Sequence, residues 1–97
     1  MRKILNEEEE RELKLLKEWC ESIISFIEET DIHTTNSKMI YLAAKNIIVQ
    51  TFNSKDLKGM RIIARDQSEW AKGLEENEVK KLNYLLQNKF GRDLTSL

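Results

Sequence analysis

Apolar residues recur every three or four positions in the first third of the chain, as they do along one face of an α-helix. A second apolar ridge runs beside the first, and together they cover roughly half of a helix circumference, which is wider than the ~100° stripe of an ordinary surface helix. We therefore expect a helix over about 7–30 that contacts more than one neighbour. The first ridge is Leu13, Leu16, Cys20, Ile23 and Ile27, and the second is Leu15, Trp19 and Phe26.

The start of this helix carries a capping signal. Asn6 can accept a hydrogen bond from a free amide of the first turn, and Glu9 stands three residues later, as in a capping box. The four glutamates at 7–10 also favour the positive end of the helix dipole. The helix is expected to end at the segment 29–37, which is dense in residues that form turns and caps.

The segment "MIYLAAKNIIVQTF" at 39–52 is apolar in almost every direction. Its β-branched residues favour a strand, but an Ala-Ala pair lies within the run, which is longer than a typical strand of about 5–6 residues. A helix over about 36–52 is the better interpretation, and at the centre of a bundle three neighbours would cover its broad side. That side is Ile40, Tyr41, Ala43, Ala44, Ile47, Ile48 and Phe52, and the polar side is interrupted by Met39, Leu42 and Val49.

Two further helices are indicated, over about 55–72 and 76–90. Ser54 is the expected N-cap of the first of them, and Gly73 its expected glycine C-cap. Gly91 is expected to end the last helix, with Leu94 folding back beyond it. Their apolar faces are Leu57, Met60, Ile63, Ala64, Trp70, Ala71 and Leu74, and then Val79, Leu82, Leu85, Leu86 and Phe90.

The four predicted helices and their short connections indicate an all-α, compact four-helix bundle-like domain that spans 1–97. Short connections favour antiparallel packing of consecutive helices. The 97 residues include no proline, which agrees with long uninterrupted helices. The length is near the lower end of what folds as a single domain.

Charge and cysteine content narrow the function classes. Sixteen basic and seventeen acidic residues leave a net charge of −1, which is not typical of proteins that bind nucleic acid or membranes through overall charge. A single cysteine, Cys20, excludes an intrachain disulfide and fits a reducing compartment. The N-terminal segment lacks the apolar core of a signal peptide, and no apolar run approaches the ~20 residues of a membrane span. We expect a cytoplasmic protein with no membrane partner.

Few residues offer catalytic chemistry. His33, the one histidine, follows Asp31 in a predicted turn without an obvious nucleophile, so a turn residue without a catalytic role is the favoured interpretation. Cys20 lies mid-helix in apolar surroundings, unlike a reactive thiol. One cysteine and one histidine do not make a usual zinc site, and there is no phosphate-binding glycine loop. We predict no catalytic, metal or cofactor site, infer no small-molecule substrate, and do not expect an enzyme.

Apolar side chains in excess of what one face needs are the main functional signal. Leaving them in water forgoes ~1.5–3 kcal/mol for each large side chain that could be buried. We therefore predict a small, non-enzymatic protein that acts by protein–protein interaction, as a regulator, an adaptor or an antitoxin- or immunity-type factor, with a second copy (a homodimer) among its partners. The candidate interface is Leu15, Trp19, Phe26, Met39, Leu42 and Val49.

A basic strip on the third helix supports an alternative. Four cations share one outward side of that helix, with Ser68 between the last two, and could contact phosphates or an acidic partner surface. Glu69 stands one turn from Arg65 and can pair with it, and no aromatic residues interleave to stack bases. A solvated amphipathic face is therefore favoured over a nucleic-acid-binding regulator. The strip is Lys58, Arg61, Arg65 and Lys72.

Two polar residues stand among apolar ones. Gln67 falls in the middle of the apolar stripe of the third helix, and Lys45 falls between Tyr41, Val49 and Phe52 on the second. A buried polar group needs a partner, whereas a lysine more often lays its carbons on the core and its ammonium in water. The sequence leaves both alternatives open for these two side chains.

Overall fold

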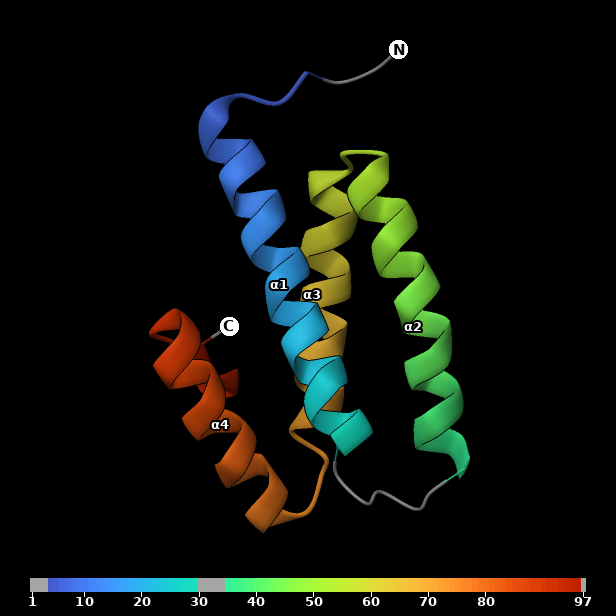
Figure 1. Cartoon of the computed structure of the whole chain (residues 1–97), viewed down its shortest axis with the longest axis vertical. Helices are drawn as coiled ribbons and strands as arrows, with labels where there is room; N and C mark the ends of the chain where they lie inside the picture. The colour runs from blue at the N-terminus through green and yellow to red at the C-terminus, as the bar shows by residue number, and fades with distance from the viewer. Residues whose placement is uncertain (1–3, 30–34, 97) are drawn as a thin grey trace.

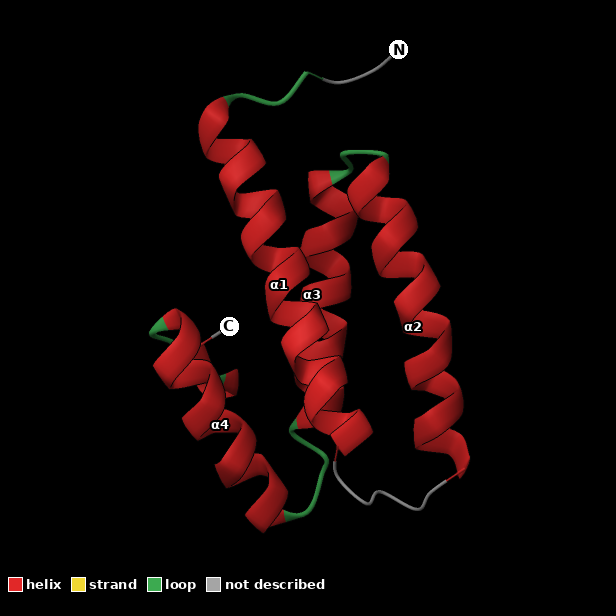
Figure 2. Cartoon of the chain, in the orientation of Figure 1, coloured by secondary structure: helices red, strands yellow, loops and turns green. Residues whose placement is uncertain are grey.

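The structure, a computed structural model, describes residues 4–29 and 35–96, without the side chains of 35–43 and 96. The described residues form four α-helices and a short 3-10 turn, and contain no strand (Figure 2). The predicted all-α, four-helix bundle-like fold is confirmed, and each helix boundary lies within two residues of its prediction. The elements are α1 (Glu7–Glu29), α2 (Thr35–Asn53), α3 (Leu57–Ala71), α4 (Glu76–Phe90) and η1 (Leu94–Ser96).

Consecutive helices run in opposite directions, with α3 directly behind α1 and with α2 and α4 on opposite sides of them (Figure 1). α1 packs against all three other helices, so the prediction that it contacts more than one neighbour is confirmed. The central position therefore belongs to α1, and α2, whose apolar residues three neighbours could have covered at the centre, packs mainly against α1 and α3. The Cα extents of 43 × 28 × 18 Å describe a slab rather than a sphere.

The second half of α1 explains its central place. Between Trp19 and Ile27 only Glu21 and Ser25 are exposed, and Glu28 follows them at the next helical spacing. These three residues form a narrow polar edge, here called the α1 strip, while the rest of the circumference is free to pack against neighbours. The buried residues of α1 are Leu13, Trp19, Cys20, Ser22, Ile23, Ile24, Phe26 and Ile27.

The core is continuous from α1 to the turn after α4. Leu94 is fully buried, and its backbone N–H donates to Asn83 Oδ1 at 2.9 Å, so the predicted fold-back of this residue is confirmed. Each large apolar side chain buried in this way contributes about 1.5–3 kcal/mol. The largest fully buried apolar side chains are Ile23, Ile48, Met60, Leu82, Leu86 and Leu94.

The helix ends confirm two capping predictions and correct two others. Glu9 N–H donates to Asn6 Oδ1 at 2.8 Å and Asn6 N–H to Glu9 Oε1 at 3.2 Å, as in a capping box. Gly91 ends α4 in the left-handed region, with φ 72°. The N-cap of α3 is Asp56 and not the predicted Ser54. The Ser54 hydroxyl instead donates back to a carbonyl of α2. Gly73 does not adopt the left-handed conformation expected of a glycine C-cap.

Candidate protein-binding grooves

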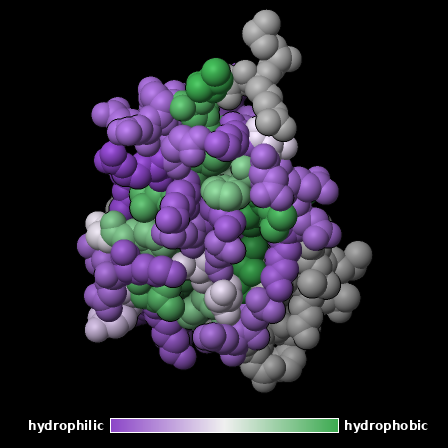
Figure 3. All heavy atoms as spheres, turned by 45° about the horizontal axis from the view of Figure 1, so that its top comes forward, coloured by the Kyte–Doolittle hydropathy of each residue, from purple (hydrophilic) through white to green (hydrophobic). Residues whose placement is uncertain are grey.

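The α1 strip lies between two grooves, because α2 and α4 flank α1 on opposite sides (Figure 1). Both grooves include Glu21 and Ser25 of the strip. One lies between α1 and α2 and is called the α1–α2 groove; the other lies between α1 and α4 and is called the α1–α4 groove. In the space-filling view of Figure 3, hydrophilic residues cover most of the visible face and apolar residues form small separate groups.

The α1–α2 groove has a volume of about 420 Å³. Ile24 and Ile48 are buried at its base, and Val49 is 51% exposed on its α2 side. The ammonium of Lys45 lies 3.2 Å from Glu28 Oε2 across the groove. Lys45 is therefore partly exposed and paired at the surface rather than buried. The lining residues are Glu21, Ile24, Ser25, Glu28, Lys45, Asn46, Ile48 and Val49.

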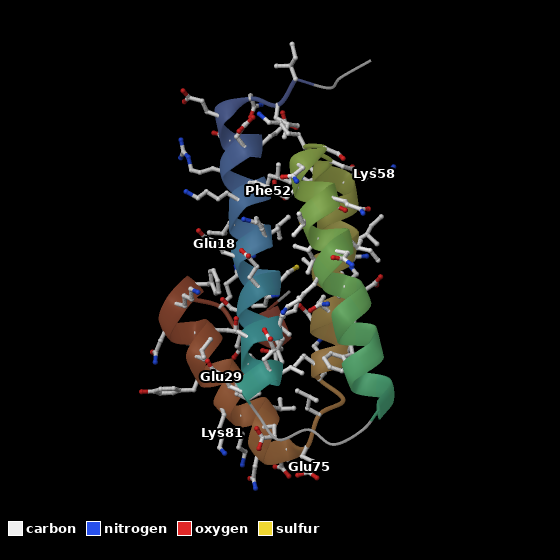
Figure 4. The ribbon with its side chains drawn as sticks, turned by 45° about the vertical axis from the view of Figure 1, so that its right-hand side comes forward. Glu18, Glu29, Phe52, Lys58, Glu75 and Lys81 are labelled. Carbon is white, nitrogen blue, oxygen red and sulfur yellow. The ribbon has the colours of Figure 1, made fainter. Side chains whose placement is uncertain are left out.

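The α1–α4 groove is smaller, at about 270 Å³, and more acidic. Phe26 is buried against it, and Leu85 is 37% exposed on its α4 side. The Lys89 ammonium donates to Ser22 Oγ at 2.9 Å. Glu18 and Glu29 lie at two heights along α1 (Figure 4), and neither pairs with a cation among the described side chains. The lining residues are Glu18, Glu21, Ser22, Ser25, Phe26, Glu29, Leu85 and Lys89.

The structure buries two residues of the candidate interface within the chain, which corrects their inclusion there. Trp19 is 3% exposed, with its ring centroid 5.3 Å from that of Phe90, and Phe26 is 8% exposed. Trp19 Nε1 donates to Ser68 Oγ at 2.9 Å, and that hydroxyl donates to Ala64 O at 2.7 Å. Because a buried indole N–H needs an acceptor, Ser68 faces the core and not the outward strip on which it was predicted.

Leu15 and Val49 of the candidate interface are about half exposed. Leu15 precedes Trp19 by one helical turn, and α4 ends at Phe90, whose ring packs against Trp19. Met39 and Leu42 belong to α2, but their side chains lie outside the described part of the chain.

Sequence reasoning placed Ile47 on the buried side of its helix, and the structure exposes it by 49%. It also missed Ile62 on α3, which is 55% exposed. α2 carries apolar residues around most of its circumference, so periodicity alone did not indicate which of Ile47 and Ile48 enters the core. His33 and Asp31 lie outside the described residues.

The basic strip of α3 is exposed but partly neutralised. Arg61 donates two hydrogen bonds to the Glu12 carboxylate, from Nε at 2.6 Å and Nη2 at 2.8 Å, and these hold the pKa of Glu12 below its ordinary value. Lys72, rather than the expected Arg65, pairs with Glu69, at 3.0 Å. Lys58 and Arg65 form no ion pair with a described side chain.

Two buried groups complete the inventory of candidate chemistry. Gln67 is 7% exposed, and its Oε1 has no hydrogen-bond partner among the described residues, so it is a buried polar group in the apolar stripe. Cys20 is fully buried, and desolvation, with a smaller contribution from Glu21, raises the pKa of its thiol to about 12. A thiol held protonated in this way is a poor nucleophile.

Within residues 4–29 and 35–96, no group of three or more histidine, cysteine or acidic side chains is arranged to hold a metal ion. No helix in the same residues combines the length and apolar character required to cross a membrane. No family model, curated protein or solved structure matches the chain.

Proposed function

We propose that this protein acts by binding another protein through the α1–α2 groove, as a cytoplasmic regulator, adaptor or antitoxin- or immunity-type factor. The observation that carries the proposal is the exposure of Val49, a branched apolar side chain at the edge of a groove whose base is Ile24 and Ile48. An apolar side chain of a partner that enters this groove would cover Val49 and extend the core of the protein.

The surroundings of Val49 have the composition of an interface rather than that of a catalytic pocket. Protein interfaces combine an apolar centre with a polar rim, and here the Glu28–Lys45 pair and Asn46 surround the apolar residues. The groove is open to solvent, whereas small-molecule sites enclose most of the ligand surface. A second copy of the chain is one partner that would fit, through a symmetric contact between two α2 helices.

The test uses a photoreactive amino acid at Asn46, on the rim of the groove, and the matched control places it at Asn88, an exposed asparagine of α4 outside both grooves. We expect a discrete cross-linked product in native-cell extract from position 46 and none from position 88. Adding Val49→Asp to the position-46 protein should abolish the product while far-UV circular dichroism stays unchanged. Equal cross-linking from both positions, or a product insensitive to Val49→Asp, would contradict the proposal.

Nucleic-acid binding through α3 is the second candidate, supported by Lys58 and Arg65, which pair with no described carboxylate. Pairing of Arg61 and Lys72 with carboxylates weakens it. A gel-shift titration at low salt tests it with wild type, Arg61→Ala/Arg65→Ala and the control Lys80→Ala/Lys81→Ala. Binding that falls with salt and is lost only in the α3 variant would support this function; the absence of any complex at low salt would eliminate it.

A further inference from the structure

The α1–α4 groove has an excess of acidic charge that the described side chains do not balance. Its lining includes three carboxylates and one ammonium, and the ammonium of Lys89 is already bound to Ser22. Glu21 lies 3.7 Å from Lys17. Glu18 and Glu29 are left without a described cation. With three carboxylates against one ammonium, the lining has a net negative charge, which favours a cationic occupant over a nucleic acid or an anionic membrane surface.

The shape of the groove favours a helix. Glu18, Ser22, Ser25 and Glu29 are spaced by four, three and four residues, so they form one line along α1. The two carboxylates are about 16 Å apart along this line, at 1.5 Å per residue, and small serines separate them. Leu85 is exposed on the opposite side of the groove, with Phe26 at its base. A helix with an apolar side chain between two cations would match this pattern.

The exposed face of α3 has this complementary pattern. Ile62, which is 55% exposed, has Lys58 one turn before it and Arg65 one turn after it. These two cations are also the ones without a described carboxylate partner. They are about 10 Å apart along α3, and their long side chains can extend outward to the more widely spaced Glu18 and Glu29.

We propose that the α1–α4 groove of one molecule binds the exposed face of α3 of a second copy. Ile62 then packs on Leu85 beside Phe26, while Lys58 and Arg65 pair with Glu18 and Glu29. This contact goes beyond the proposed function, because it uses neither Val49 nor the α1–α2 groove, and it accounts for the basic strip without nucleic acid.

The position of the two surfaces determines the kind of assembly. α1 lies at the front of the molecule and α3 behind it in Figure 1, and Figure 4 shows Glu18 and Glu29 toward α4, with Lys58 on the other side. Two different surfaces meet in such a contact, so the interface is heterologous and joins molecules in a head-to-tail series rather than a closed twofold dimer. Because its energy comes largely from exposed charges, we expect association to weaken strongly as the ionic strength rises.

The test is a charge-reversal exchange followed by sedimentation equilibrium at low and high salt. The groove variant is Glu18→Lys/Glu29→Lys, and the face variant is Lys58→Glu/Arg65→Glu. We expect wild type to self-associate in a concentration-dependent way at low salt and each variant alone to remain monomeric. An equimolar mixture of the two variants should associate again, because each reversed surface meets an oppositely charged one.

A matched control reverses two cations outside both surfaces, Arg11→Glu/Lys80→Glu, and should associate like wild type. Ile62→Ser should weaken association at least several-fold without changing the far-UV circular dichroism, since Ile62 is more than half exposed and lies outside the buried core. Wild type that stays monomeric at low salt at every concentration would overturn the inference, as would variants that associate unchanged or fail to associate when mixed. None of these results would affect the Asn46 cross-linking experiment, so the two proposals fail independently.

Discussion

α1 and α2 are both rich in large apolar residues, but they differ in how completely these residues are buried. From Trp19 to Ile27 nearly every side chain of α1 is buried, whereas on the described half of α2 Ile48 is buried and its neighbours Ile47 and Val49 are about half exposed. Apolar content therefore does not decide which helix takes the centre of the bundle.

The distribution of polar residues explains the difference. Between Trp19 and Glu28, the exposed residues of α1 are Glu21, Ser25 and Glu28, which lie on a single line, so this half of the helix can meet neighbours on its other sides and still expose one edge to water. α2 has apolar residues on both sides of its axis, and no orientation buries all of them in a packing with two neighbours. Apolar side chains of α2 therefore remain exposed to water, and a partner that covers them would recover the free energy of burying them.

The largest expected effect is in the reactivity of cysteines placed on the two helices. Cys20 is fully buried with its pKa raised to about 12, so iodoacetamide should reach it only when the protein unfolds. In the Cys20→Ser background, Ile47→Cys should react roughly 10³-fold faster or more, given typical stabilities of 5–15 kcal/mol. Mass spectrometry of quenched samples measures both rates. Comparable rates in native buffer would mean that α1 is not the protected helix.

Truncation of one isoleucine on each helix tests the same comparison through stability. Ile23→Ala on α1 removes a fully buried side chain, and we expect a loss of about 2–5 kcal/mol in the free energy of unfolding. Ile47→Ala on α2 should change it by less than about 0.5 kcal/mol. Urea unfolding followed by circular dichroism gives both values. An equal loss for the two variants would show that α2 is packed as closely as α1.

Removing the hydrogen bond between Trp19 and Ser68 should lower the free energy of unfolding by less than truncating the Ile23 side chain does. Ser68→Ala leaves the buried indole N–H without an acceptor, so we expect a loss of about 1–3 kcal/mol. Ser25→Ala, on the exposed strip, is the matched control, with a change within about 0.5 kcal/mol. In a Trp19→Phe background the cost of Ser68→Ala should shrink, and urea unfolding of all four combinations gives the coupling. A cost that does not shrink would mean that the hydroxyl acts through Ala64 alone.

The smallest effect concerns the surface pair between Glu12 of α1 and Arg61 of α3. Its hydrogen bonds lower the pKa of Glu12 in the folded state, so the stabilisation is present above the unfolded-state pKa and is lost as the pH falls through the folded-state value. Glu12→Gln should therefore be slightly less stable than wild type at neutral pH, with the gap closing in acid, below about pH 4.5. Urea midpoints across a pH series measure this. A stability difference between Glu12→Gln and wild type that persists at the lowest pH would mean that side-chain packing, rather than the charge of Glu12, causes it.

Much of the secondary structure was predictable because its signals are local. The capping box of Asn6 and Glu9, the left-handed Gly91 and the four helices depend on residues within a few positions of one another. The errors occurred where two signals competed, as at Asp56, which caps α3 while the hydroxyl of Ser54 bonds back to α2.

Less of the candidate site was predictable. Val49 and Leu15 are exposed as the excess of apolar residues suggested, but the same reasoning included Trp19 and Phe26, which are buried within the chain, Trp19 against Phe90 of α4. Nothing in the periodicity of α1 indicates where a helix some sixty residues later will end. The outward placement of Ser68 was wrong for a similar reason, since its acceptor role depends on an indole from another helix.

The sequence by itself determined the helical elements, most of their ends and the apolar faces, because hydrogen bonding and periodicity act between residues a turn or two apart. Only the tertiary structure decided that α1 is central, that α4 stops beside Trp19, and that two grooves border the α1 strip, of which the α1–α4 groove is the more acidic. Those outcomes depend on which helix covers which face, and that choice is made by the packing of side chains far apart in the chain.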